Sequence, residues 1–168
     1  MNINAIQNYD SKNKTSFQKL KVVVKGAEFE KNLRDKKLIE EAIKNDEGLK
    51  KFFSNHNGKI TVTSGTVKVP VTHDYPECLK RVPGQSLPFD QFTLEEPSYC
   101  TNIKCEYNRA FALRNLFRKP VKVEAGVQNK NEVLSWNTCV DYTLRLIKEK
   151  LADAIQGCEQ RRLKVEKP

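Results

Sequence analysis

The sequence lacks long apolar runs and the motifs by which many enzymes bind phosphates or metal ions. No stretch approaches the roughly 20 apolar residues that span a bilayer, and the N-terminus has neither the charged nor the apolar region of a secretory signal peptide. We therefore expect a cytoplasmic protein without a transmembrane segment, with non-classical export left open. With 7 glycines in 168 residues and no glycine-rich phosphate loop, Gly-x-Ser-x-Gly or His-Glu-x-x-His motif, enzymatic activity is the less favoured expectation.

The cysteine content gives no sign of a disulfide framework. The chain has 5 cysteines, an odd number, and no export signal accompanies them. Because thiols of cytosolic proteins are normally reduced, we expect free cysteines.

Positive charge is in excess and unevenly distributed. The formal net charge is +9, yet residues 74–100 contain five acidic and two basic residues, so the excess lies elsewhere in the chain. A basic surface attracts nucleic acids, anionic membranes or acidic proteins. An ordinary solvated, lysine-rich surface is the simpler interpretation.

Hydrophobic patterning predicts one domain, residues 17–168, after a flexible leader at residues 1–16. Three consecutive valines in residues 17–25 predict a central strand that is covered on both faces. Residues 28–54 are helical in pattern and are expected to bend near residues 45–48.

The middle of the chain is expected to hold a hairpin and a long insertion. A two-residue turn at Ser64-Gly65 would place the apolar residues of 60–69 on one face of two paired strands. Pro70 cannot donate to a strand ladder, so the second strand is expected to be an edge strand there. Residues 73–105 hold four prolines and no regular period, which predicts an irregular, Pro-rich insertion.

The last third is expected to hold a short helix, a strand and a long helix. Residues 106–119 are expected to form the short helix, ended by Pro120, and residues 121–123 a strand. A helix over residues 129–157 is amphipathic, with a capping box at its start and Gly157 at its end. The tail at residues 161–165 is expected to be a short strand or a frayed end.

Together these elements predict an α+β fold. We expect a small, mainly antiparallel sheet of about three to five strands, packed by the long C-terminal helix and one or two N-terminal helices.

Cys139 is a candidate nucleophile. The segment Trp136-Asn137-Thr138-Cys139 before an apolar helix resembles the nucleophile helix of permuted papain-like thiol hydrolases. The resemblance implies a cysteine at a helix N-terminus whose thiolate is stabilised by the helix dipole and a histidine. His73 or His56 would be the base. If the helix starts near Asn129, however, Cys139 lies in its third turn at the edge of the buried face, where it acts as a small apolar side chain.

A zinc site is a second candidate. Four residues that zinc can bind, His73, Cys78, Cys100 and Cys105, fall in the Pro-rich insertion. Their spacings are His-x4-Cys and Cys-x4-Cys, whereas zinc knuckles usually show Cys-x2-Cys. Buried free thiols and a surface histidine are therefore the favoured interpretation.

A basic segment is the favoured binding surface. Arginines at 109, 114 and 118 would share one face of the predicted helix and could contact phosphates. No RRM, KH, helix-turn-helix or zinc-finger signature accompanies them. The candidate binding residues are Lys104, Arg109, Arg114, Arg118, Lys119 and Lys122.

The favoured function is a non-enzymatic binding protein whose basic surface contacts an acidic protein or a nucleic acid. A thiol hydrolase that uses Cys139 with His73, and a zinc-stabilised module, are the alternatives.

Overall fold

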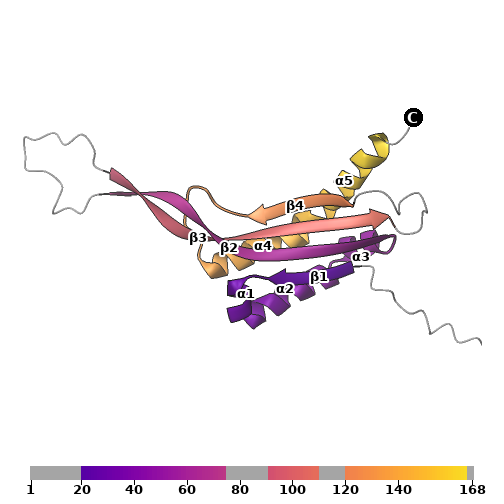
Figure 1. The fold of residues 1–168 in the computed structure, drawn as a ribbon, viewed down its shortest axis with the longest axis horizontal. Helices are drawn as coiled ribbons and strands as arrows, with labels where there is room; N and C mark the ends of the chain where they lie inside the picture. Colours follow the sequence, from indigo (N-terminus) through magenta and orange to yellow (C-terminus); the bar gives the residue numbers. More distant parts are fainter. Residues whose placement is uncertain (1–19, 75–90, 110–119, 166–168) are drawn as a thin grey trace, which may run out of the picture.

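The computed structural model describes residues 20–74, 91–109 and 120–165 (Figure 1). Over these residues the chain forms four strands, five helices and one π-helical turn. In chain order they are β1 (Leu20–Lys25), α1 (Ala27–Lys31), α2 (Leu33–Asn45), α3 (Glu47–Phe53), β2 (His56–Asp74), β3 (Gln91–Arg109), β4 (Val121–Val127), α4 (Trp136–Leu146), the π turn η3 (Ile147–Leu151) and α5 (Ala152–Val165).

The strands form one mixed sheet in the order β1-β2-β3-β4. β1 runs parallel to β2, and the other two neighbouring pairs are antiparallel. The predicted α+β class, with a mainly antiparallel sheet and a long C-terminal helix, is confirmed. The central position expected for β1 is wrong, because β1 lies at one edge and only one of its faces is covered. Val24 is buried against the helices, whereas Val23 on the opposite face is partly exposed.

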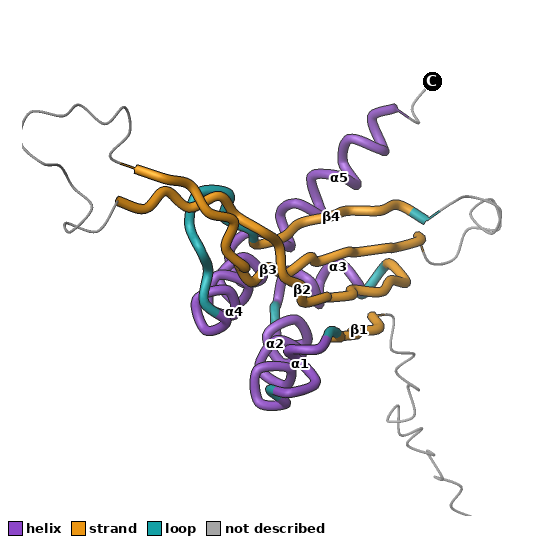
Figure 2. Tube along the Cα trace, turned by 60° about the vertical axis from the view of Figure 1, so that its left-hand side comes forward, coloured by secondary structure: helices purple, strands orange, loops and turns teal. Residues whose placement is uncertain are grey.

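All the described helices pack on one face of the sheet. Figure 1 looks onto the opposite face, with the strands in front of the helices, and Figure 2 shows the same arrangement from the side. The core lies between the two layers. Its fully buried side chains include Phe29 of α1, Ile39 and Ile43 of α2, Ile60 and Val62 of β2, Ile103 of β3, and Ile147 and Ile155 of the C-terminal helix.

The N-terminal helical region bends where the sequence predicts. Asp46 separates α2 from α3, and its side chain accepts a hydrogen bond from the Leu49 N–H at 2.8 Å, which caps α3. A second break at Asn32 separates α1 from α2. Three short helices therefore connect the parallel strands β1 and β2.

The predicted turn at Ser64-Gly65 is wrong. β2 continues through these residues to Asp74, and Ser64 and Gly65 pair with Thr101 and Cys100 of β3. The apolar pattern also fits a continuous strand. Val62 is buried on one face of the β2–β3 ribbon, and Val69, beyond the point where β1 ends, is buried on the other face.

The outer halves of β2 and β3 form a two-stranded arm that extends past β1 and β4 (Figure 1). The irregular structure expected for residues 73–105 is therefore wrong for residues 91–105, which belong to β3. Residues 75–90, including Cys78, lie outside the described residues. Pro70 lies in this arm, where β2 has a partner on one side only, as predicted.

The long helix begins later and ends later than predicted. Ser135 caps α4, because its Oγ accepts a hydrogen bond from the Thr138 N–H at 3.2 Å. The expected capping box is wrong, since Asn129 and Glu132 bond to each other in the preceding loop. The helix then continues through Gly157 to Val165, so the C-terminal segment is helical rather than a strand.

Within the described part of the chain, the structure contains no helix that combines the length and the hydrophobicity required to cross a membrane.

Candidate functional site

The face of the sheet opposite the helices is polar and carries five lysines. Val24, Ile60, Ile103 and Val123 pack in the core. Because consecutive side chains of a strand point to opposite faces, the residues next to these four in the sequence point outward. One row crosses all four strands, because Lys21 pairs with Lys59, Lys59 with Glu106, and Glu106 with Lys122. The charged residues of this open face are Lys21, Lys25, Lys59, Lys104, Lys122, Glu106 and Glu124.

The positive charge of the open face is concentrated on β1 and β2. On the β3–β4 side, Glu106 lies 3.6 Å from Lys104 and 3.8 Å from Lys122, and Glu124 lies 4.0 Å from Lys104. On the other side, no described carboxylate forms an ion pair with Lys21 or Lys59, which face each other directly. Like charges at opposed positions destabilise a sheet. An anion bound there would remove this cost.

The structure brings together only part of the predicted basic segment. Lys104 and Lys122 lie on the open face, and Arg109 is the last residue of β3. The helix expected over residues 106–119 is wrong for Glu106 to Arg109, which are in the strand. The alternation of Ile103, Cys105 and Tyr107, all buried, was the signal for a strand. Arg114, Arg118 and Lys119 lie outside the described residues.

Cys139 lies in the first turn of α4, closer to the helix N-terminus than predicted. It is nonetheless fully buried. Burial raises the pKa of the thiol to about 11, and the hydroxyls of Thr101 and Thr143 only partly oppose this effect. Low-pKa thiols are usually partly exposed and beside a positive charge. The environment of Cys139 is that of a structural cysteine.

Neither histidine lies near Cys139. Cys139 contacts Thr101 of β3, which pairs with Ser64 of β2. His73 is nine residues further along β2, roughly 30 Å away at about 3.3 Å per residue, and His56 lies about 26 Å away in the other direction. The two histidines bind Glu96 and Glu159 instead. The structure does not assemble a cysteine–histidine pair at this helix.

The described zinc candidates are also separated. Cys100 and Cys105 are five residues apart on β3, roughly 16 Å, and His73 is roughly 26 Å along the arm from Cys100. Ligands of one zinc ion must each lie about 2.0–2.3 Å from it. In the part of the chain that the structure describes, no group of three or more His, Cys, Asp and Glu side chains could hold a metal ion.

Alkylation should distinguish Cys139 from a reactive cysteine. Because its thiol is buried and protonated at neutral pH, we expect Cys139 to react with iodoacetamide at least about tenfold more slowly than the partly exposed Cys158. Peptide mapping by mass spectrometry gives both rates in one sample. Faster modification of Cys139 than of Cys158 in the folded protein would support the nucleophile.

A buried polar cluster lies where β3 meets α5. Arg162 donates from Nε and Nη2 to the two carboxylate oxygens of Glu159, at 2.8 and 2.7 Å, and the Tyr107 hydroxyl donates to the same group at 3.2 Å. His56 Nε2 lies 3.6 Å from Glu159 Oε1, and its Nδ1 donates to the Phe52 carbonyl. The cluster attaches α5 to the sheet and is structural.

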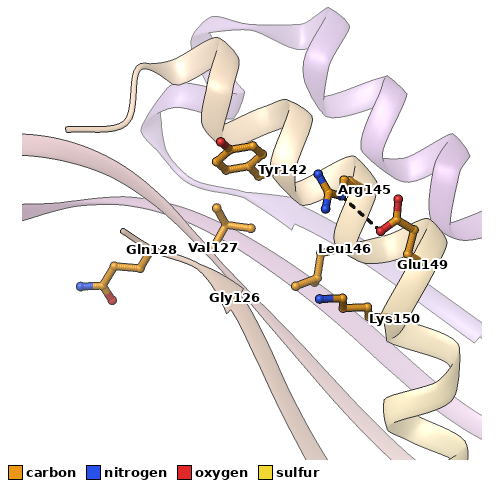
Figure 3. A pocket seen from close by; sticks show the side chains of 8 residues that line it. All are labelled: Gly126, Val127, Gln128, Tyr142, Arg145, Leu146, Glu149 and Lys150. Atoms are coloured by element: carbon orange, nitrogen blue, oxygen red, sulfur yellow. Dashed lines mark hydrogen bonds and ion pairs between the residues drawn. The ribbon is translucent and has the colours of Figure 1, made fainter. Parts of the chain in front are cut away.

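A groove lies at the C-terminal end of β4 (Figure 3). It has a volume of about 410 Å³ and lies between the end of β4, at Gly126 and Val127, and the exposed side of the long helix. Tyr142 and Leu146 project from the helix toward the strand, and Lys150 lies at the far end. Arg145 on the rim forms an ion pair with Glu149 at 3.2 Å.

Comparison with known proteins adds no functional assignment. No family model matches the chain, and no curated protein and no solved structure is significantly similar to it.

Proposed function

We propose that this is a non-enzymatic binding protein that presents the open face of its sheet to an acidic partner, either an acidic protein or a nucleic acid. One observation carries the proposal. The fold places Lys21 and Lys59 opposite each other, with Lys25 on the same face, and no described carboxylate forms an ion pair with these three. The helices cover the other face, so the lysines remain accessible.

The alternatives have less support. A thiol hydrolase would require a histidine beside Cys139, and both histidines lie far along β2. A zinc module would require ligands that lie much closer together than His73, Cys100 and Cys105 do.

The proposal is tested by removing charge from the open face. We expect a Lys21→Gln/Lys59→Gln double variant to bind a polyanion more weakly and with a smaller dependence on salt. For double-stranded DNA the slope of log K against log salt should fall by about 0.9 for each phosphate that the variant no longer neutralises. The measurement is fluorescence anisotropy over a salt series, with a labelled DNA duplex, a labelled RNA strand and labelled poly-glutamate as separate probes.

A Lys37→Gln/Lys51→Gln variant is the matched control. Both lysines are exposed on the helical layer, so the change in net charge is the same while the open face is intact. Equal weakening by the two double variants would show that net charge, not the open face, attracts the probes. Absence of salt-sensitive binding to all three probes would also refute the proposal.

A further inference from the structure

The outer edge of β4 is the part of the sheet best placed to accept another strand. β4 is the last strand in the order β1-β2-β3-β4, so its outer backbone groups have no strand partner among the described residues. Unpaired edge groups readily hydrogen-bond an added strand. At the end of β4 this edge borders the groove formed with the long helix, whose Tyr142 and Leu146 face the strand (Figure 3).

The groove gives an added strand an apolar contact on the helix side. An edge strand flanked by a helix is the arrangement by which several domains bind extended peptides, with backbone hydrogen bonds for affinity and alternate side chains for specificity. Here Val127 and Leu146 offer apolar surface, and Lys150 carries a positive charge at the rim. Inward-pointing side chains of an added strand would therefore be apolar.

The charges of β4 on the open face indicate which outward-pointing side chains an added strand would carry. Along β3 and β4 the signs alternate in both directions, since Glu106 pairs with Lys122 and Lys104 pairs with Glu124. A fifth strand continues this pattern with a carboxylate opposite Lys122 and a cation opposite Glu124. These two side chains are 57% and 61% exposed, and each already forms a long ion pair with β3, so an added strand would extend the same row of alternating charges.

We propose that β4 is a docking strand, to which an extended segment of a partner protein adds with alternating apolar and charged side chains, acidic opposite Lys122 and basic opposite Glu124. A second folded copy fits less well, because α5 runs past the edge of β4 (Figure 1) into the space that the helices of the copy would occupy. This contact uses Lys122 and Glu124 at the β4 side of the open face and does not involve Lys21, Lys25 or Lys59, on which the proposed function rests.

The test uses two peptides whose charge pattern is the same read from either end, so that parallel and antiparallel addition give the same charge pairs. One has the sequence Thr-Val-Glu-Val-Lys-Val-Glu-Val-Thr and the other has glutamate at all three charged positions, so that in no register can it place a cation opposite Glu124. We expect the first to protect amides of β4 from hydrogen exchange and to bind about fivefold more tightly than the second. In a Glu124→Lys variant, which presents two lysines to the added strand, the preference should reverse, whereas Glu47→Lys on α3, which changes the net charge equally, should leave the preference unchanged.

A Tyr142→Ala variant serves as the groove control. Tyr142 is 47% exposed, so loss of its ring should leave folding intact while weakening the binding of both peptides. Lack of protection at β4 with either peptide would overturn the proposal, as would protection without reversal of the preference. Dimerisation through β4, measured by analytical ultracentrifugation, would identify a second copy as the occupant instead. None of these results depends on the lysines of β1 and β2, so the proposed function is tested separately.

Discussion

Replacement of Arg162 by alanine is expected to lower the free energy of unfolding by about 3 kcal/mol. Arg162 binds both carboxylate oxygens of Glu159, and only 8% of the Glu159 side chain is exposed. Loss of the guanidinium leaves a buried carboxylate with the Tyr107 hydroxyl as its remaining hydrogen-bond donor and His56 nearby. Urea unfolding followed by circular dichroism gives the difference from the unsubstituted protein.

Two companion variants separate this effect from a general loss of helix stability. Arg161→Ala removes an exposed arginine from the same helix and should change the stability by less than about 0.5 kcal/mol. Arg162→Lys keeps the positive charge but loses the two-pronged geometry, so an intermediate loss is expected. Similar stabilities for the two alanine variants would show that the Glu159 pair contributes little.

The same variants have a characteristic dependence on pH. Burial by itself raises the pKa of Glu159, but the hydrogen bonds and charge of Arg162, together with Tyr107, hold it below its ordinary value of 4.5. The stabilisation from ionised Glu159 is therefore complete above about pH 4.5 and is lost as the pH falls through the lower folded-state pKa. The difference between the unsubstituted protein and Arg162→Ala should thus be large near about pH 7 and narrow near about pH 3. A difference that does not change with pH would exclude the carboxylate as its cause.

Replacement of Gly26 by alanine is expected to cost about 3 kcal/mol or more. Gly26 links β1 to α1 with φ 124° and ψ 153°, a backbone conformation that is essentially restricted to glycine. A Cβ atom there would also lie 2.9 Å from both the backbone nitrogen and the backbone oxygen of Ser64. The substitution therefore combines backbone strain with a clash against β2, which cannot move without disturbing its pairing with β3.

Gly157→Ala is the matched control, with an effect of the opposite sign. Gly157 lies inside α5, and a Cβ atom there would meet no atom within 4 Å. Alanine is favoured over glycine in a helix interior by about 1 kcal/mol, so this variant should be more stable than the unsubstituted protein. Thermal unfolding of the two variants side by side tests both expectations. A mild effect of Gly26→Ala would mean that β1 can shift away from Ser64.

Local sequence patterns correctly predicted the elements whose conformation depends on residues close to one another in the sequence. The valines of β1, the bend at Asp46 and the amphipathic stripe of the long helix each follow from spacing and capping within about ten residues. The start of the long helix was less predictable, because the sequence offers two possible N-cap residues. Ser135 starts the helix although Asn129 and Glu132 offered an earlier signal, because those two side chains bond to each other.

The predictions for β2 and β3 were wrong because these strands are held extended by pairing between residues that are distant in the sequence. Ser64-Gly65 has the residues of a tight turn, but it stays extended because β3 pairs with β2 on both sides of it. Its closeness to Gly26, which lies 38 positions earlier, could not be inferred from a single sequence. The four prolines of residues 73–105 predicted irregular structure, yet Pro97 is accommodated in the two-stranded arm opposite Lys68.

The candidate binding surface shows the same division. The excess of positive charge, the fold class and the amphipathic long helix were predictable, because they depend on composition and on periodicity along the chain. Which lysines lie on one face depends on the order of the strands, since Lys21, Lys59 and Lys122 come from three separate strands. The tertiary structure also decided that Cys139 is buried in the first turn of a helix, far from either histidine. Strand order and packing bring together residues that are distant in sequence, and no local pattern records that order.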